Sequence, residues 1–196
     1  MFTAPEVFII ESLEHVDETN DRYEGKLLSH ILKMNGKQCI YHYIRTEGEF
    51  KEAVKLFNQC NYRYLHLSCH GNQQAMKTTQ DVIFFDDLGE ILQPYINNKR
   101  LFVSACDMVN ENLAQIIIPK SGCYSIIGPA AEISFSSAAI FWASFYHLMF
   151  KYDFDEMVRK TLLKYCQHLA KLFMISINYY SISRTNSKRY KLTEIQ

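Results

Sequence analysis

Residues 65–71, LHLSCHG, and residues 101–107, LFVSACD, decide the fold expected for this chain. Each stretch is an apolar run that stops at small or reactive side chains. A short, continuous apolar run is typical of a strand that is buried on both faces of a sheet. We therefore predict two buried strands, one that ends beside His70 and one that ends beside Cys106.

Helix-like segments alternate with further strand-like runs around these two stretches. Strands are expected at residues 7–10, 39–44, 62–68, 101–105 and 124–128, and helices at 21–34, after a capping box at Thr46 and Glu49, and at 136–150. This alternation predicts an α/β fold, a three-layer α/β/α sandwich with a mostly parallel central sheet. The polar stretch 72–80 lacks apolar periodicity and is expected to be a mobile loop.

The composition is that of a globular protein, with 48% hydrophobic and 21% charged residues in 196. The sequence starts without the pattern of a secretory signal, and its longest mostly apolar run, residues 138–150, is too short to cross a bilayer. The six cysteines have no CxxC spacing, so reduced thiols are expected. These features predict a cytoplasmic protein without a membrane partner.

Charge is distributed unevenly along the chain. Residues 1–150 hold 12 basic and 17 acidic side chains, a net of −5, and residues 151–196 hold 9 and 4, a net of +5. The basic residues of the tail are too few and too scattered to predict nucleic-acid binding. A tail that is solvated, or that pairs with the acidic body, is expected instead.

The two motifs end at a position with chemical meaning. Open parallel sheets bind ligands beyond the carboxyl ends of their strands, so His70 and Cys106 meet there if their strands are neighbours. A free cysteine, with a pKa of about 8.5, is mostly protonated at neutral pH, and a histidine can take its proton. The amides of Gly71 and Cys106 could then hold an oxyanion. We hypothesise a His70–Cys106 catalytic dyad.

Other interpretations of these residues remain open. A histidine at a strand end is often only a hydrogen-bonded structural residue, and a cysteine in an apolar context is often inert. Cys69 could form a metal site with His70 and Cys106, but no fourth ligand stands at a suitable spacing, so no metal or cofactor is expected. Alternation along the strand should turn Cys69 away from the crevice, and should bury His66 on the opposite face of the sheet from its neighbours.

HLSCHG followed by LFVSACD resembles the paired motif of the caspase-like cysteine peptidases, and most closely that of the CHAT group, which is related to separase. A strand ending in His-Gly corresponds to Leu65–Gly71, and a strand ending in Ser-Ala-Cys to Leu101–Cys106. Residues 84–92 and 121–150 also resemble the family. The resemblance implies a caspase-like domain over residues 1–150, with residues 151–196 as a C-terminal helix and strand-like extension packed on the same domain.

The resemblance also implies an activity, that of a cysteine endopeptidase that cleaves a specific protein substrate. A peptidase domain of this kind resembles prokaryotic antiviral defence proteases. A sensor partner activates these proteases, and they cleave a dedicated effector. The alternative is a caspase-like binding or signalling module that has lost catalysis. Asp107 stands where caspases carry arginine, so it is expected either to favour a basic substrate residue or to cap the next helix. The 36-residue spacing between His70 and Cys106 is shorter than the roughly 50 of caspases.

Overall fold

A seven-stranded sheet forms the centre of the computed structural model, which describes residues 3–152 and 156–196. Its strands are β1 (Ala4–Glu11), β2 (Ile40–Tyr43), β3 (Tyr62–Ser68), β7 (Arg100–Ser104), β8 (Ser125–Pro129), β9 (Ile177–Ile182) and β10 (Tyr190–Ile195), in the order β10-β9-β8-β7-β3-β1-β2. The first five run parallel, and β9 is antiparallel to both of its neighbours. The prediction of a mostly parallel sheet is confirmed.

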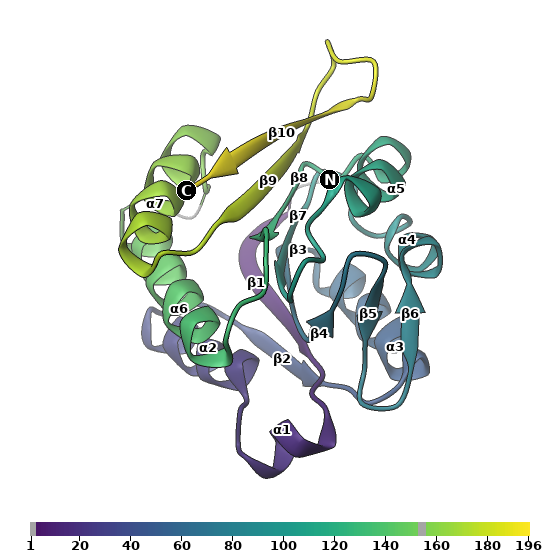
Figure 1. Ribbon diagram of the computed structural model, residues 1–196, viewed down its shortest axis with the longest axis vertical. Coiled ribbons are helices and arrows are strands. Elements are labelled where there is room, and N and C mark those ends of the chain that lie inside the picture. The colour runs from purple at the N-terminus through teal and green to yellow at the C-terminus, as the bar shows by residue number, and fades with distance from the viewer. Residues whose placement is uncertain (1–2, 153–155) are drawn as a thin grey trace.

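Helices cover both faces of this sheet (Figure 1). They are α1 (His15–Thr19), α2 (Glu24–Met34), α3 (Glu47–Cys60), α4 (Phe85–Leu92), α5 (Glu111–Ser121), α6 (Phe135–Tyr152) and α7 (Arg159–Phe173). Helices α2, α6 and α7 pack on one face, and α3, α4 and α5 on the other. The expected capping box begins α3, where the Glu49 amide donates to Thr46 and the Glu49 carboxylate accepts from the Thr46 amide. Because helices cover both faces of the sheet, the three-layer prediction is confirmed.

Alternation along β3 divides its side chains between two apolar cores. Leu65 and Leu67 contribute to the core under α3, α4 and α5. His66 lies on the other face, where its Nδ1 is 2.9 Å from the hydroxyl of Tyr146. Phe102 of β7 lies on that face as well, with its ring 5.8 Å from that of Trp142 on α6. The expected structural place of His66 is therefore confirmed.

A second, smaller sheet replaces part of the loop that we expected at residues 72–80. Strands β4 (His70–Gly71), β5 (Ala75–Lys77) and β6 (Val82–Phe84) pair antiparallel in this order. The Asn72 side chain accepts hydrogen bonds from the amides of Gln74 and Ala75 and so closes the first turn. Three residues of strand are too few for apolar periodicity to reveal them. The loop prediction was therefore wrong at residues 75–77, whereas residues 72–74 and 78–80 lie between strands.

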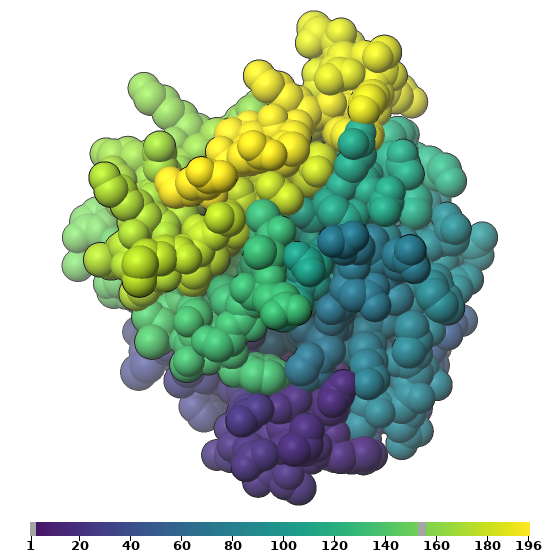
Figure 2. All heavy atoms as spheres, viewed as in Figure 1, coloured from purple at the N-terminus to yellow at the C-terminus, as the bar shows by residue number. Residues whose placement is uncertain are grey.

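The last strands form a hairpin that extends the sheet beyond β8. Strand β9 pairs with β8 on one side and with β10 on the other. The hairpin protrudes at the top of the molecule in Figure 2. Of the helices in the described residues, none is long and apolar enough to cross a membrane.

The aromatic core beside α6 supplies a test of the fold. Phe102 is fully buried, and its ring lies within 6.0 Å of those of Tyr64, Trp142, Phe145 and Tyr146. We expect Phe102→Ala to lower the free energy of unfolding by about 3–5 kcal/mol, because the truncation leaves a cavity. Urea denaturation measures the loss. Ile140→Ala is the control on the outer side of α6, where the side chain is 52% exposed and a change within about 0.5 kcal/mol is expected. Equal losses for the two variants would contradict the placement of this core.

Candidate active site

The register of β3 and β7 brings the two sequence motifs together. Ser68 pairs with Ser104, so the residues that follow them leave the sheet at the same edge. The amide of Cys69 still donates to the carbonyl of Ser104, at 3.1 Å. Beyond this bond, His70 and Cys106 both line a small cavity of about 40 Å³. The structure therefore places the two residues of the predicted dyad at one site.

The ring of His70 is held by a carboxylate that the sequence analysis did not single out. Asp17, on α1, is 2% exposed, and its Oδ2 lies 2.6 Å from Nε2 of His70. Its other oxygen accepts from Nη1 of Arg22 at 2.9 Å. An ionised carboxylate only accepts hydrogen bonds, so this contact favours a ring proton on Nε2, and in the neutral ring that tautomer leaves the lone pair on Nδ1. Phe135 packs edge-on against the ring, at 5.4 Å between centroids.

Cys106 lies in the turn that follows β7 and is partly exposed. The amide of Ile133 donates to its sulfur, at 3.5 Å. Ile133 precedes α6, so this contact fixes the thiol relative to the start of that helix. The candidate nucleophile is consequently held from two sides, by its own strand and by the segment before α6.

The six cysteines are free thiols, and burial makes most of them poor nucleophiles. Burial raises the pKa of Cys39 and of Cys123 to about 12, and it raises the pKa of Cys166 above its ordinary value. Cys69 is among the residues that line the same cavity as His70, but it packs against the core under α3, α4 and α5, so our expectation that its side chain turns away stays a prediction. Burial also raises the pKa of Cys69, which keeps this thiol protonated.

Asp107 does not have the capping role that we considered for it. The N-cap of α5 is Asn110, whose side chain accepts from the amide of Leu113 and donates to the carbonyl of Asp107. Asp107 itself has a left-handed backbone, with φ of 54°. Among the described residues, those that line the cavity beside His70 and Cys106 do not include it. Its role in specificity stays a prediction.

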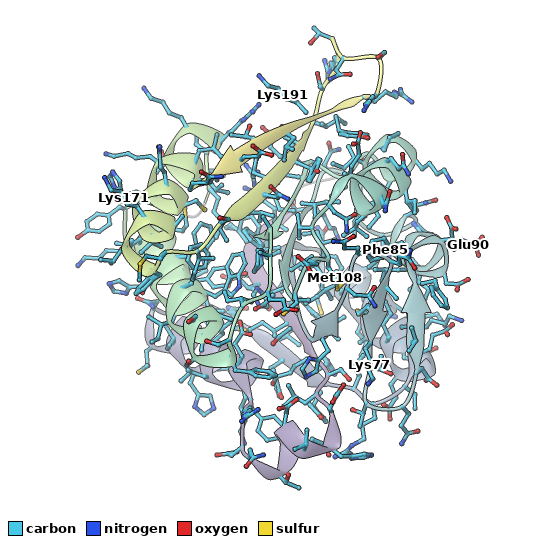
Figure 3. All side chains as sticks on the ribbon, in the orientation of Figure 1. Lys77, Phe85, Glu90, Met108, Lys171 and Lys191 are labelled. Carbon is cyan, nitrogen blue, oxygen red and sulfur yellow. The ribbon has the colours of Figure 1, made fainter. Side chains whose placement is uncertain are left out.

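Gly71 follows His70 in β4 and lies against Met108, which is labelled near the centre of Figure 3. A Cβ atom at position 71 would come within 2.3 Å of Cγ of Met108. A larger residue here would therefore force the buried Met108 side chain to shift, so packing favours a glycine whether or not its amide binds an oxyanion. An oxyanion hole formed by the amides of Gly71 and Cys106 remains a prediction.

Below the cavity, a buried carboxylate joins the ends of β3 and β7. Oε2 of Glu24, at the start of α2, accepts from the hydroxyls of Ser68 at 3.1 Å and Ser104 at 2.8 Å. Glu24 is 4% exposed, and its Oε1 lies 3.8 Å from Nε2 of His66. Glu11, at the end of β1, accepts from the amides of Gly25 and Lys26. These bonds tie three strands to α2 directly beneath the candidate dyad.

A metal site at this edge would involve other residues than those we considered. Glu14, Asp17 and His70 offer ligand atoms that all lie within 4.8 Å of one another. However, Lys77 pairs with Glu14 and Arg22 with Asp17, so these carboxylates already have cationic partners. The cluster is more simply explained as the support of His70.

Two residues that contact the candidate site, Asp17 and Glu24, were missed in the sequence. Both follow β1, and the first strand of a parallel sheet ends at the same edge as its neighbours. The run of acidic residues after Ile10 was therefore a usable signal. It pointed to the correct edge, although not to the pairing of Asp17 with His70.

Comparison with solved structures gives information on the fold, whereas the sequence comparisons do not. No family model matches the sequence, and no curated protein does either. Caspase-1 from Spodoptera frugiperda superimposes with a TM-score of 0.53 at 14% identity, over 97% of this chain and 85% of that chain. The Arg-specific cysteine proteinase gingipain R gives 0.52 at 15% identity, over 75% of this chain and 37% of that chain.

A complex of the pro- and mature domains of RgpB from Porphyromonas gingivalis gives a TM-score of 0.57 at 14% identity, over 85% and 43% of the two chains. This chain therefore spans less than half of the gingipain chains that it matches. The neighbours show a caspase-like fold, as the sequence resemblance implied. At 14% and 15% identity, these superpositions support a similarity of fold alone.

Glu11 gives the site a measurable dependence on pH. Burial raises the pKa of Glu11 from 4.5 to about 7, against the opposing hydrogen bond from the Gly25 amide. The folded state then binds more protons than the unfolded chain, so this group's stabilising contribution is complete below pH 4.5 and is lost as the pH rises through 7. We expect Glu11→Gln to gain stability relative to the parent protein between pH 5 and pH 8.

Urea denaturation at several pH values measures this difference. Glu132→Gln, which alters an exposed carboxylate, is the matched control and should follow the parent curve. Parallel curves for the parent protein and Glu11→Gln would show that Glu11 does not titrate in this range.

Proposed function

We propose that this chain is a cysteine peptidase in which Cys106 is the nucleophile, His70 the general base and Asp17 the residue that orients His70. One observation carries the proposal: a buried carboxylate holds Nε2 of a histidine that lines the same cavity as a partly exposed cysteine. A carboxylate on one ring nitrogen leaves the other nitrogen as a base, which is the logic of a catalytic triad.

The reaction follows from this arrangement. Nδ1 of His70 takes the proton of the Cys106 thiol, and the sulfur attacks the peptide carbonyl carbon. The amides of Gly71 and Cys106 are the candidate donors for the oxyanion that forms. The imidazolium then returns its proton to the leaving amine as the C–N bond breaks. Water, deprotonated by the same nitrogen, hydrolyses the thioester and restores the thiol.

The alternative, an inactive binding module, explains less of the site. Burial of the Asp17 carboxylate is costly unless it is paired and hydrogen-bonded. Its two partners are Arg22 and His70. A module that only bound a partner would not require a buried carboxylate in contact with a partly exposed histidine. The buried Asp17 therefore supports catalysis over binding alone.

The finer placement of the activity rests on the sequence resemblance. We propose a CHAT-type peptidase that acts in the cytoplasm on a specific protein substrate, in regulated cleavage such as antiviral defence. An activating sensor or an effector would then be its partner. Neither a nucleic acid nor a membrane enters this scheme.

The dyad predicts which thiol reacts first. We expect iodoacetamide to alkylate Cys106 fastest near pH 7, because His70 can take its proton. A free thiol is only a few per cent ionised at that pH, so the gain from a base amounts to about tenfold or more. His70→Ala should remove that gain. Mass spectrometry of tryptic peptides gives the rate at each cysteine.

Cys60→Ala is the control, since Cys60 is a partly exposed thiol outside the cavity. Its removal should leave the rate at Cys106 unchanged. Fastest alkylation at Cys69, or an unchanged rate in His70→Ala, would overturn the dyad.

Asp17 is predicted to act through His70. We expect Asp17→Asn to slow the alkylation of Cys106 by about tenfold, because an amide no longer fixes the ring proton on Nε2. Asp17→Glu should recover part of the rate, which a merely structural defect would not explain. Glu90→Gln changes an exposed carboxylate on α4, outside the cavity, and should leave the rate as it is. A full rate in Asp17→Asn, with an unchanged melting temperature, would remove Asp17 from the site.

A further inference from the structure

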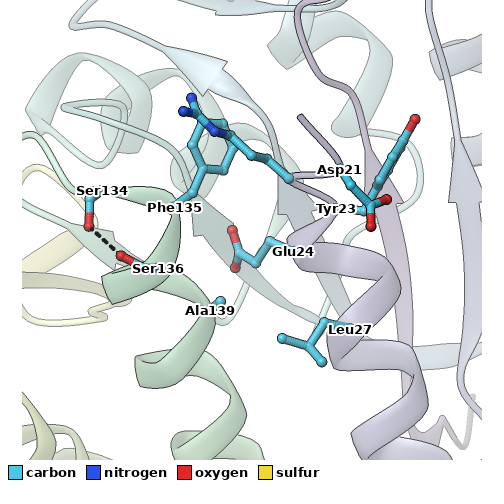
Figure 4. Close-up of a pocket in the computed structure, with 9 residues that line it drawn as sticks. Asp21, Tyr23, Glu24, Leu27, Ser134, Phe135, Ser136 and Ala139 are labelled. Carbon is cyan, nitrogen blue, oxygen red and sulfur yellow. Dashed lines mark hydrogen bonds between the residues drawn. The ribbon is translucent and has the colours of Figure 1, made fainter. Parts of the chain in front are cut away.

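A larger pocket adjoins the catalytic cavity, between the first turns of α2 and α6 (Figure 4). Its volume is about 580 Å³, within the range of pockets that hold ligands. Glu24 and Phe135 line both the pocket and the cavity. Since Phe135 packs edge-on against His70, a group bound in the pocket lies one ring away from the candidate base.

Apolar side chains form part of the wall of this pocket, beside the polar side chains of Tyr23, Ser134 and Ser136. Leu27 of α2 is 47% exposed, and Phe135 and Ala139 face it from α6. Leucine and phenylalanine side chains lose contact with water only when another apolar group covers them, which favours an apolar ligand.

Glu24 does not make the pocket acidic, although it lines it. Its Oε2 accepts from the hydroxyls of Ser68 and Ser104, and its Oε1 is inaccessible to solvent. Hydroxyl groups therefore already engage Oε2, and Oε1 is closed to solvent, so Glu24 is less available to a charged ligand than an exposed carboxylate would be. A basic ligand would find only a weakened counter-charge at the base of the pocket.

The remaining charges at the pocket are engaged or exposed. The guanidinium of Arg22 pairs with the buried Asp17 at 2.9 Å and lies over the ring of Phe135 at 5.7 Å. Asp21 is exposed to water, where a single charge contributes little to selectivity. An acidic ligand would share the Arg22 guanidinium with Asp17, and a basic one would have only a screened partner.

We propose that this pocket binds an uncharged apolar side chain of the substrate next to the scissile bond, with Leu27, Phe135 and Ala139 as its specificity residues. This inference rests on the proposed peptidase function. It names the substrate class as proteins cleaved beside a residue such as leucine, methionine or phenylalanine. The apolar part of the wall selects this residue, and the continuity with the catalytic cavity places its backbone beside Cys106.

Peptidyl acyloxymethyl ketones test the pocket, because they alkylate an active cysteine only after their side chain is seated. Four probes would differ solely in the residue next to the reactive ketone, which would be Leu, Phe, Arg or Asp. We expect the Leu or Phe probe to label Cys106 at least about tenfold faster than the Arg and Asp probes, from the burial of one apolar side chain. Mass spectrometry measures the labelled fraction over time.

Two variants test whether this pocket determines the preference among the probes. Ala139→Phe should fill the pocket and lower the ratio of the Leu-probe rate to the iodoacetamide rate by about tenfold. Iodoacetamide is too small to use the pocket, so it normalises for the state of the dyad. Ile140→Phe is the matched control one residue along α6, outside the pocket lining, and should leave the ratio unchanged.

The outcomes separate this inference from the function on which it rests. If iodoacetamide labels Cys106 in a His70-dependent manner but the Arg probe is fastest, the apolar pocket is wrong and an acidic residue such as Asp107 sets specificity. A fastest Asp probe also overturns it, in favour of Arg22. A ratio that Ala139→Phe leaves unchanged excludes this pocket as the selective one. If Cys106 shows no His70-dependent labelling at all, the proposed function and the pocket's role fail together.

Discussion

The carboxylate of Glu24 holds together the two strand ends from which the candidate site is built. A carboxylate removed from water is costly unless hydrogen bonds replace its hydration. Here the hydroxyls of Ser68 and Ser104 supply them, one from each strand. The bonds fix β3 and β7 at the last pair of their register, and both motifs leave the sheet from that point. The distance between His70 and Cys106 is thus set by polar contacts at the edge and by the apolar core beneath.

A second constraint fixes the direction of the histidine. The small sheet of β4, β5 and β6 holds the backbone of His70, while α1 brings Asp17 to its ring from a segment 53 residues away in sequence. Neither contact would orient the ring alone, since a backbone leaves the side chain free to rotate. Together with the edge of Phe135 they leave His70 one arrangement, with Nδ1 unoccupied by the carboxylate. Preorganisation of this kind is what general-base catalysis requires.

Apolar periodicity predicted the large elements of this fold because burial on a sheet or a helix face repeats over many residues. The same logic failed wherever an element was short. The five residues of α1 and the three of β5 contain too few apolar positions to form a pattern. Asn110 and Asp107 can both cap a helix, and only the observed start of α5 distinguishes them.

The partners of the buried acidic residues could not be predicted from the sequence for a different reason. A pattern treats Asp17 and Glu24 as surface residues of short helices, because nothing local announces a partner dozens of positions away. Their roles follow only from tertiary contacts, and these contacts connect the site to the neighbouring pocket. Arg22 pairs with Asp17 on one side and covers Phe135 on the other. An apolar side chain seated against Phe135 would displace water from this ion pair, and Coulombic attraction strengthens as water is excluded. Occupation of the pocket would therefore strengthen the contact of Arg22 with Asp17, the carboxylate that contacts His70.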